Sequence, residues 1–299
     1  MRLLLATLFI GISFTAFSQK YVDLAKFHYQ STGNNLFDSS SNETKIDELS
    51  LNITLPLKIN DKTAILTGFS IDQYTTDLTE FGDNTTISSY LLKAGVNINH
   101  NEKWNGTYLV LPKLSSNFQE KDKENFQLGA VALLKYQKDP NMRYKMGLYY
   151  NGDKFGNFFV PLFGFYYKKN KFEADITLPV SVDVNYRVKE NLFVGMDFRA
   201  IVKSFNLTQS LQSLGEEYIE QKSNEVMGYL GYEFKNGLIL KGLVGYSIGR
   251  SYGMYEQQDK IDWGLSAFKF GDNRNQLNSD FADGLLFRAQ MVYRFHIKD

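Results

Sequence analysis

Acidic residues at regular spacing in the middle of the chain are the first candidates for chemistry. Polar and apolar residues alternate through the stretch FEADITLPVSVDVNYRV, residues 172–188. If the chain turns at 178–180 and again at 189–191, three of its neighbouring strands place carboxylates opposite one another, about 5 Å apart. This predicted acidic row consists of Asp175, Asp183 and Asp197, with Glu173 one step below. Carboxylates so close repel one another unless water, cations or arginines offset their charge.

Four arginines that the alternation places on the polar face of their strands are candidates for that offset. They are Arg187, Arg199, Arg288 and Arg294. The first two flank the acidic row within its own strands, and the other two point inward from the last alternating segment. One interpretation is a charge-lined aqueous channel that selects solutes by charge. The other is a solvated wall whose charges balance one another.

The three histidines, His28, His100 and His296, limit the enzymatic alternatives. An outer-membrane lipid hydrolase would need a histidine and a serine paired on the lipid-facing wall. Only His28 lies within a predicted strand. Its neighbours on the same face of that strand are polar, which predicts that its side chain points inward. Clusters of histidine or cysteine that could hold a metal are missing from the sequence, so no metal or cofactor is expected. We therefore expect no enzyme, with a lipid hydrolase as the weaker alternative.

The long loop 250–280 contains more apolar mass than a simply solvated loop needs. Its large apolar residues include Trp263, Phe268 and Phe270. A loop of this length is usually functional or disordered. We expect it either to fold inward as a constriction or to pack on other loops as a cap.

The gross features place the protein outside the cytoplasm. Residues 1–18 combine Arg2 with a short apolar run and small residues at cleavage positions, which predicts a signal peptide and a barrel domain over 19–299. Basic and acidic residues balance at 33 each, so a nucleic-acid partner is not expected. The chain has no cysteine and no apolar run long enough for a membrane helix. A soluble secreted all-β protein or a closed membrane barrel remains.

Period-two alternation is the dominant pattern and predicts long strands. Its clearest case is LSLNITLPLKI, residues 49–59. Similar segments cover roughly 20–30, 63–74, 87–99, 104–114, 126–136, 143–150, 158–168, 192–203, 224–235, 238–249 and 284–297. These runs exceed the usual length of sandwich strands and match tilted membrane strands. The sequence therefore favours an all-β, antiparallel, up-and-down transmembrane barrel.

The lengths of the connections and the need for an even number of strands refine this prediction. Short turns alternate with long polar loops at roughly 31–45, 75–86, 115–125, 151–157, 204–223 and 250–280, the pattern of outer-membrane barrels. A chain that starts and ends on the periplasmic side needs an even number of strands. Because proline is disfavoured inside a paired strand, a break at Pro179 divides 172–188 into two strands. This gives about fourteen strands, with twelve as the alternative.

The last alternating segment, LLFRAQMVYRFHIKD, resembles the final strands of outer-membrane barrels, which end in an aromatic residue recognised by the assembly machinery. Here Phe295 is followed by His296 to Asp299. The runs TLPVSVDVNYRVKENLFVGMDF and GRSYGMYE resemble an uncharacterised outer-membrane barrel family of Bacteroidota. The resemblance implies the fold and an outer-membrane location, and it implies no reaction.

Taken with the charged inner face, these features predict a passive, porin-like channel for small hydrophilic solutes or ions. Outer-membrane lipid, these solutes and the assembly machinery are the expected partners. The alternative is a closed barrel that works through its extracellular loops as a structural or interaction protein.

Overall fold

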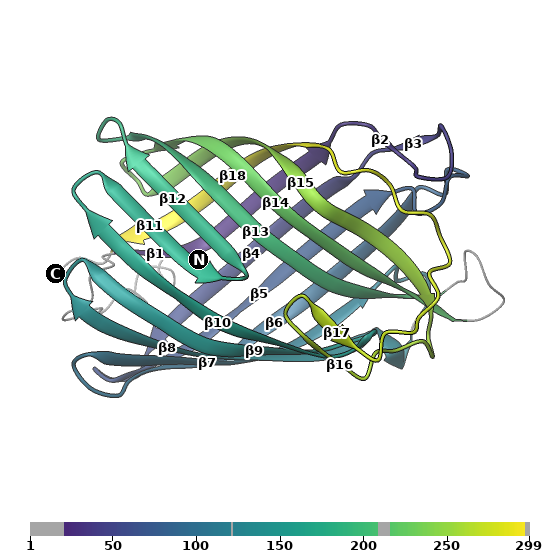
Figure 1. Ribbon diagram of the computed structural model, residues 1–299. Helices are drawn as coiled ribbons and strands as arrows, with labels where there is room; N and C mark the ends of the chain where they lie inside the picture. The colour runs from purple at the N-terminus through teal and green to yellow at the C-terminus, as the bar shows by residue number, and fades with distance from the viewer. Residues whose placement is uncertain (1–20, 121, 209–215, 297–299) are drawn as a thin grey trace, which may run out of the picture.

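The computed structural model describes residues 21–120, 122–208 and 216–296. Figure 1 shows a barrel of long, tilted strands. The predicted signal peptide, residues 1–18, lies outside the described residues. Within the described part of the chain, no helix is both long and apolar enough to cross a membrane. The helical element that is described, η1 (Lys123–Asn125), is a short 3-10 turn.

Fourteen of the described strands form one closed antiparallel sheet, in which each strand pairs with the next along the chain and β18 pairs with β1. In chain order they are β1 (Tyr21–Thr32), β4 (Asp47–Lys58), β5 (Thr63–Thr76), β6 (Thr85–Asn99), β7 (Trp104–Ser116), β8 (Phe126–Asp139), β9 (Met142–Asp153), β10 (Gly156–Lys169), β11 (Phe172–Leu178), β12 (Ser181–Arg187), β13 (Leu192–Leu207), β14 (Glu217–Glu233), β15 (Leu238–Glu256) and β18 (Leu285–His296). The predicted barrel of fourteen strands is confirmed, and the alternative of twelve is excluded.

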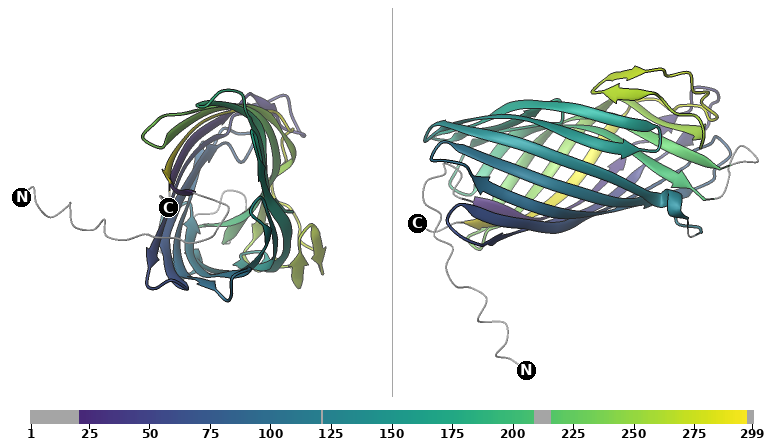
Figure 2. Two further views of the ribbon diagram at one scale, coloured as in Figure 1. Left: turned by 90° about the vertical axis from the view of Figure 1, so that its left-hand side faces the viewer. Right: turned by 90° about the horizontal axis from the view of Figure 1, so that it is seen from below.

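The two ends of the barrel differ in their connections. Short turns join the strands at one end, where Tyr21 of β1 lies opposite His296 of β18. We call this the turn end, and Figure 2 shows the ring of strands viewed from it. The opposite loop end carries the short pairs β2 (Asn35–Leu36) with β3 (Glu43–Thr44) and β16 (Trp263–Leu265) with β17 (Phe268–Phe270).

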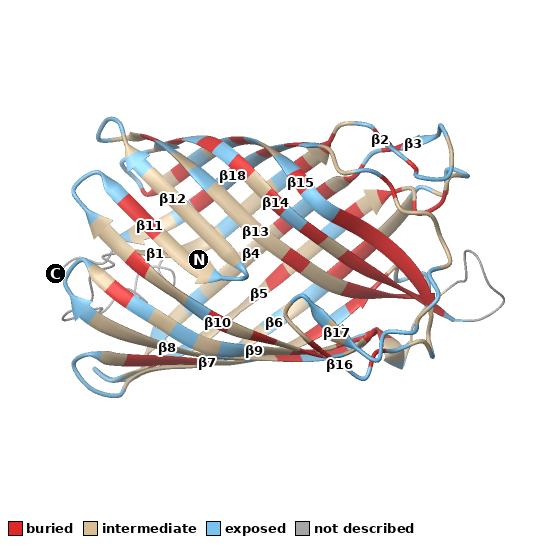
Figure 3. Ribbon diagram, in the orientation of Figure 1, coloured by how far each residue is buried: buried red, intermediate tan, exposed pale blue. Residues whose placement is uncertain are grey.

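The alternation of the sequence places apolar side chains on the outer face of the wall. Leu57, Met196 and Leu230 are among the large apolar residues exposed there. Exposed and buried positions follow one another along the strands in Figure 3. Such an apolar outer face is stable when lipid covers it, and closure of the sheet leaves no strand edge open along most of the wall.

Residues 172–188 form a short hairpin that ends halfway along the barrel. The chain turns at Pro179, as predicted, and the amide of Val180 donates to the carbonyl of Thr177 at 2.9 Å. Strands of seven residues at a tilt of about 40° reach roughly 18 Å, less than an apolar band of about 25 Å. The turn therefore lies at lipid depth. This explains its composition without glycine or asparagine, because Leu178 and Val180 face outward at 50% and 37% exposure.

Beyond this hairpin the wall changes shape, because β13 has no β12 neighbour after Ala200. The loop-end halves of β13, β14 and β15 turn inward and are largely buried, and Figure 3 shows their burial. Asn206 of β13 pairs in parallel with Ser116 of β7, and Ser115 of β7 donates its hydroxyl to the carbonyl of Ser204 at 2.7 Å. We call these three strand ends the inward sheet.

Both faces of the inward sheet are covered by apolar side chains from other strands and loops. One face carries Phe205 and Ile219, which pack with Phe37, Tyr74, Leu78 and Phe281. The opposite face carries Tyr218 and Tyr255, which pack with Phe155, Phe158, Val160 and Leu162. The loop end of the barrel is therefore filled with protein.

The inward sheet corrects the predicted loops at 204–223 and 250–280. β13 continues to Leu207, β14 begins at Glu217 and β15 continues to Glu256. The polar residues in these stretches, such as Ser204 and Glu220, indicated loops that are exposed to solvent. In the structure they are fully buried, because they meet polar partners inside the barrel.

Candidate functional site: the barrel lumen

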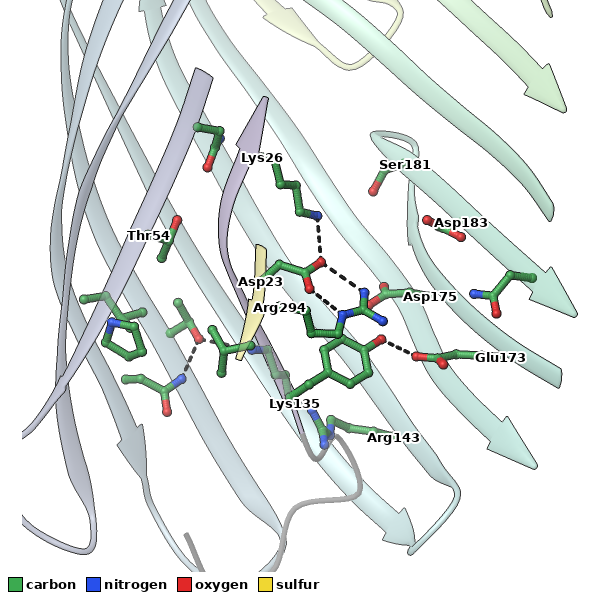
Figure 4. A pocket seen from close by; sticks show the side chains of 18 of the residues that line it. Asp23, Lys26, Thr54, Lys135, Arg143, Glu173, Asp175, Ser181, Asp183 and Arg294 are labelled. Atoms are coloured by element: carbon green, nitrogen blue, oxygen red, sulfur yellow. Dashed lines mark hydrogen bonds and ion pairs between the residues drawn. The ribbon is translucent and has the colours of Figure 1, made fainter. Parts of the chain in front are cut away.

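The turn-end half of the lumen encloses a cavity of about 730 Å³. Inward side chains of the described strands line it, and most of them are charged or carry amides and hydroxyls (Figure 4). The cavity extends to the strand ends at the turn end, where Tyr21, Asn99 and Arg187 line it. Its wall can therefore hold water and hydrophilic solutes.

The predicted acidic row exists, since Asp175 lies opposite Asp183 and Asp183 lies opposite Asp197. Each carboxylate contacts a basic side chain from another part of the wall. Asp183 accepts from Lys241 at 3.1 Å, Asp197 lies 3.2 Å from Arg288, and Asp175 contacts Lys145. The row is thus neutralised, and its predicted effect on ion selectivity stays a prediction.

Hydroxyl groups complete the environment of these carboxylates. Tyr229 donates to Asp183 at 2.5 Å, and Gly195 makes room for its ring, because a Cβ at that position would lie 2.4 Å from the ring carbon Cζ. Glu173 accepts from Tyr166 at 3.0 Å, contacts Tyr21 and lies 3.0 Å from Lys168.

Two of the four predicted arginines lie near the turn end, away from the acidic row. Arg294 donates to Asp23 at 2.7 Å. Arg187 donates to Glu233 of β14 at 2.7 Å, although it follows Asp183 on the same strand. At the rim of the cavity, Arg294 links the neighbouring strands β18 and β1, and Arg187 links β12 to β14 across β13.

The other two arginines lie deeper, in what we call the central ion cluster: Glu48, Glu225, Arg199, Arg288 and His28. Glu225 accepts from Arg199 at 2.5 Å and from Arg288 at 2.6 Å. Arg199 of β13 also contacts Glu48 of β4, so the cluster spans the lumen between two strands that are not neighbours. The two glutamates are at most 4% exposed.

His28 points into the lumen, as predicted, and its Nε2 lies 3.1 Å from Glu48. It therefore does not contribute to a lipid-facing pair with a serine.

On the loop-end side of the central ion cluster, the lumen narrows to a space of about 10 Å³, which is room for no more than one water molecule. Lys203 donates there to Asp72 and Tyr74, both at 2.8 Å. Further towards the loops, Arg274 contacts Glu220 at 3.0 Å and lowers the pKa of Asp272 through a hydrogen bond. Side chains thus separate the cavity from the loop end.

The aromatic residues of the predicted constriction lie outside this lumen. β16 pairs with β10 at Phe158 and Phe159, and β17 pairs with β16. Trp263 stacks on Phe270 at 4.3 Å between ring centroids, and Phe268 is 69% exposed. The loop does not form the expected constriction. Beyond the end of the short hairpin, the edge of β10 has backbone groups without a β11 partner, and β16 pairs with them.

A later part of the same loop, together with Phe281 directly after it, packs on the loop end as the alternative of a cap predicted. Phe281 packs against Phe37 and Tyr252, and Leu277 contacts the same apolar cluster.

The sequence pattern did not indicate Lys145, Lys241, Glu48 and Glu225 as partners of the predicted charges. Three of them occupy inward positions in the alternating segments, and Glu48 directly precedes such a segment, so the alternation alone would have placed all four on the inner face. Their pairing depends on which distant strands approach one another across the lumen, and no local pattern gives that information.

Fold and lumen together define a transmembrane β-barrel with a polar cavity at one end and a filled lumen at the other. A family model described as "Domain of unknown function (DUF6268)" matches residues 10–279, so the chain belongs to that family. An origin in Bacteroidota stays a prediction. No curated protein matches the chain.

Several solved structures resemble the chain at low identity. The COG4313 outer membrane channel from Pseudomonas putida F1 is 10% identical, with 94% of this chain and 97% of that chain covered and a TM-score of 0.45. The Pseudomonas putida toluene transporter TodX is 12% identical, with 93% and 90% covered and a TM-score of 0.37. The NanC porin is 9% identical, with 91% and 99% covered and a TM-score of 0.33. The function is therefore argued from the lumen itself.

Proposed function

We propose that the protein is a passive channel for small hydrophilic solutes in the outer membrane, with the turn end towards the periplasm. The observation that carries this proposal is the cavity of about 730 Å³ with its charged and amide-bearing wall. A barrel that served only as a scaffold could fill its lumen completely with side chains. Here half of the lumen stays open to solutes.

Passage requires the inward sheet to move, since it fills the loop end. Its contacts with β7–β9 and with the turn after β9 include polar ones, such as Ser204 with Asp153 at 2.8 Å and with the amide of Lys154 at 2.8 Å. Such hydrogen bonds exchange with water at little net cost, about 1 kcal/mol each. In this proposal, the filled loop end corresponds to a closed state of the channel.

A disulfide lock tests this proposal directly. Ser116 and Asn206 are Cα partners, and the chain has no cysteine of its own, so the double variant Ser116→Cys/Asn206→Cys would hold the inward sheet against β7. In planar bilayers we expect conductance steps from the reduced variant and their loss on oxidation. The single variants are the controls, and both should conduct under either condition. Absence of conductance from the wild type and from the reduced variant would contradict the proposal.

The main alternative is a closed barrel that works through its loops as a structural or interaction protein. The two apolar clusters that seal the loop end favour it. In that case, no condition of the lock experiment would give conductance.

A lipid hydrolase is the weaker alternative, because His28 belongs to the central ion cluster. We expect no lipase activity from the wild type. Activity that His28→Ala abolished would revive this alternative.

A further inference from the structure

The cavity wall contains two lysines that face each other across neighbouring strands. Lys135 of β8 and Lys145 of β9 are Cα partners, and both belong to the inward phase. Like charges directly opposite in a sheet destabilise it. This pair therefore needs negative charge near both amines.

Lys145 receives that charge from within the protein. Its amine contacts Asp175 and donates to Thr177 at 3.1 Å, both on β11. The residue between them on β10 is Gly164, which pairs with Lys145 on one side and Thr177 on the other. Because Gly164 has no side chain, Lys145 can extend over β10, away from Lys135.

Lys135 makes no such ion pair. Among the residues that the structure describes, no carboxylate lies within 4 Å of its amine, and its one hydrogen bond is a long contact of 3.4 Å to the hydroxyl oxygen of Thr107. The nearby carboxylates of the cavity are bound elsewhere, as Asp175 is by Lys145 and Asp183 by Lys241.

A second cation lies beside Lys135 in the same wall. Arg143 precedes Lys145 by two positions on β9 and lines the cavity together with Lys135, as Figure 4 shows. Its Nε donates to Gln137 at 3.0 Å, and its guanidinium lies 5.6 Å from the ring centroid of Tyr166. These contacts fix the orientation of a planar donor group that suits oxyanions.

Neutral hydrogen-bonding groups adjoin these cations. Asn97 donates to Thr107 at 2.8 Å and to Asn105 at 2.9 Å, so the amides hold Thr107 in place. Thr107 accepts these bonds, and its own hydroxyl proton meets no acceptor among the described residues, although the residue is only 8% exposed. The proton is thus available to a bound acceptor.

We propose that Lys135, Arg143 and Thr107 form a binding site for a small oxyanion, a phosphate or carboxylate group of a hydrophilic solute. The anion would supply the charge that Lys135 lacks and accept the hydroxyl proton of Thr107. The site deepens the proposed channel function, on which it rests for the route by which the solute arrives. It assigns anionic solutes to the channel.

Titration of the folded, detergent-solubilised protein with inorganic phosphate tests the site. Calorimetry at constant ionic strength, with sodium chloride replacing phosphate in the reference, measures the affinity. We expect Lys135→Gln to weaken phosphate binding at least tenfold. The matched control is Lys93→Gln, because Lys93 is another inward lysine, held by Asn52 and Thr54 at 2.7 Å, and its loss should leave the affinity unchanged.

A second readout covers the possibility that the variant folds poorly. Without phosphate, Lys135→Gln should melt at a higher temperature than the wild type, because it removes the repulsion by Lys145. Wild-type protein that binds no phosphate, or equal binding by Lys135→Gln and wild type, would overturn the proposal. Since the titration needs no open pore, conductance without phosphate binding would reject the site alone, and binding without conductance would reject the channel alone.

Discussion

The two halves of this barrel use the same fourteen strands in opposite ways. At the turn end, inward side chains surround a cavity of about 730 Å³ and pair their charges around it. At the loop end, the inward sheet and two apolar clusters occupy the space, and a gap beside the central ion cluster measures about 10 Å³. The difference shows that strand number alone does not decide whether a barrel has a pore.

A single local feature accounts for much of the difference. The hairpin β11–β12 ends at Pro179, halfway along the barrel, so β13 loses its neighbour after Ala200. Backbone groups without partners are costly in lipid. The remainder of β13 therefore turns inward to polar partners on β7–β9, while β16 covers the exposed edge of β10.

The largest expected effect comes from the apolar packing of the loop end. Phe205→Ala should lower the free energy of unfolding by about 3–5 kcal/mol, because it leaves a cavity around a fully buried ring. Phe287→Ala, on the lipid-facing side, is the control and should cost under about 1 kcal/mol in detergent. Denaturant unfolding measures both, and equal costs would mean that the loop end is not a packed core.

Removing a buried charge in the lumen should have the next largest effect. Glu225→Gln leaves Arg199 and Arg288 with less compensation and should cost about 3 kcal/mol. Asp183→Asn is the matched change at the open cavity, where water can solvate Lys241, and about 1 kcal/mol is expected. If the two variants unfold at the same denaturant concentration, water reaches the central ion cluster as easily as it reaches the cavity.

Depth in the membrane gives a third comparison. Leu178→Lys puts a charge on the hairpin turn at lipid depth and should destabilise the barrel by about 2–4 kcal/mol in vesicles. Ile59→Lys, on the outer face at the turn end, should cost about 0–1 kcal/mol. The free energy of folding into lipid vesicles is the measurement. A small cost at Leu178 would place the hairpin turn in water.

The smallest expected effect concerns ion selectivity. Because each carboxylate of the acidic row has a basic partner, Asp183→Asn and Asp197→Asn should shift the cation-to-anion permeability ratio by about twofold towards anions. Reversal potentials across a salt gradient measure the ratio. If it does not change, the acidic row has no part in selectivity.

The sequence predicted the barrel because alternation, turn spacing and parity are local signals. The break at Pro179 and the register of Asp175 with Asp183 followed from these signals alone. The inward sheet could not be predicted in this way. Its strands carry buried polar residues such as Ser204 and Glu220, and these are indistinguishable from loop residues until the partners that approach them across the lumen are known.

The charge pairs show the same limit. Phase identified Arg199 and Arg288 as inward residues, yet Arg199 binds Glu48, which is distant in the sequence and five strands away around the sheet. Closure of the barrel, together with the length of each side chain, determines such contacts.

The central claim, a lumen that is wet at the turn end and filled at the loop end, is tested most directly by single-cysteine labelling. The natural chain has no cysteine, so each variant carries one reactive thiol. A thiol at Asn185→Cys, which lines the cavity, should react readily with a charged, membrane-impermeant reagent in the folded protein. A thiol at Ser204→Cys, buried where the inward sheet meets β7–β9, should react only after unfolding. Equal labelling rates at the two positions would contradict the account.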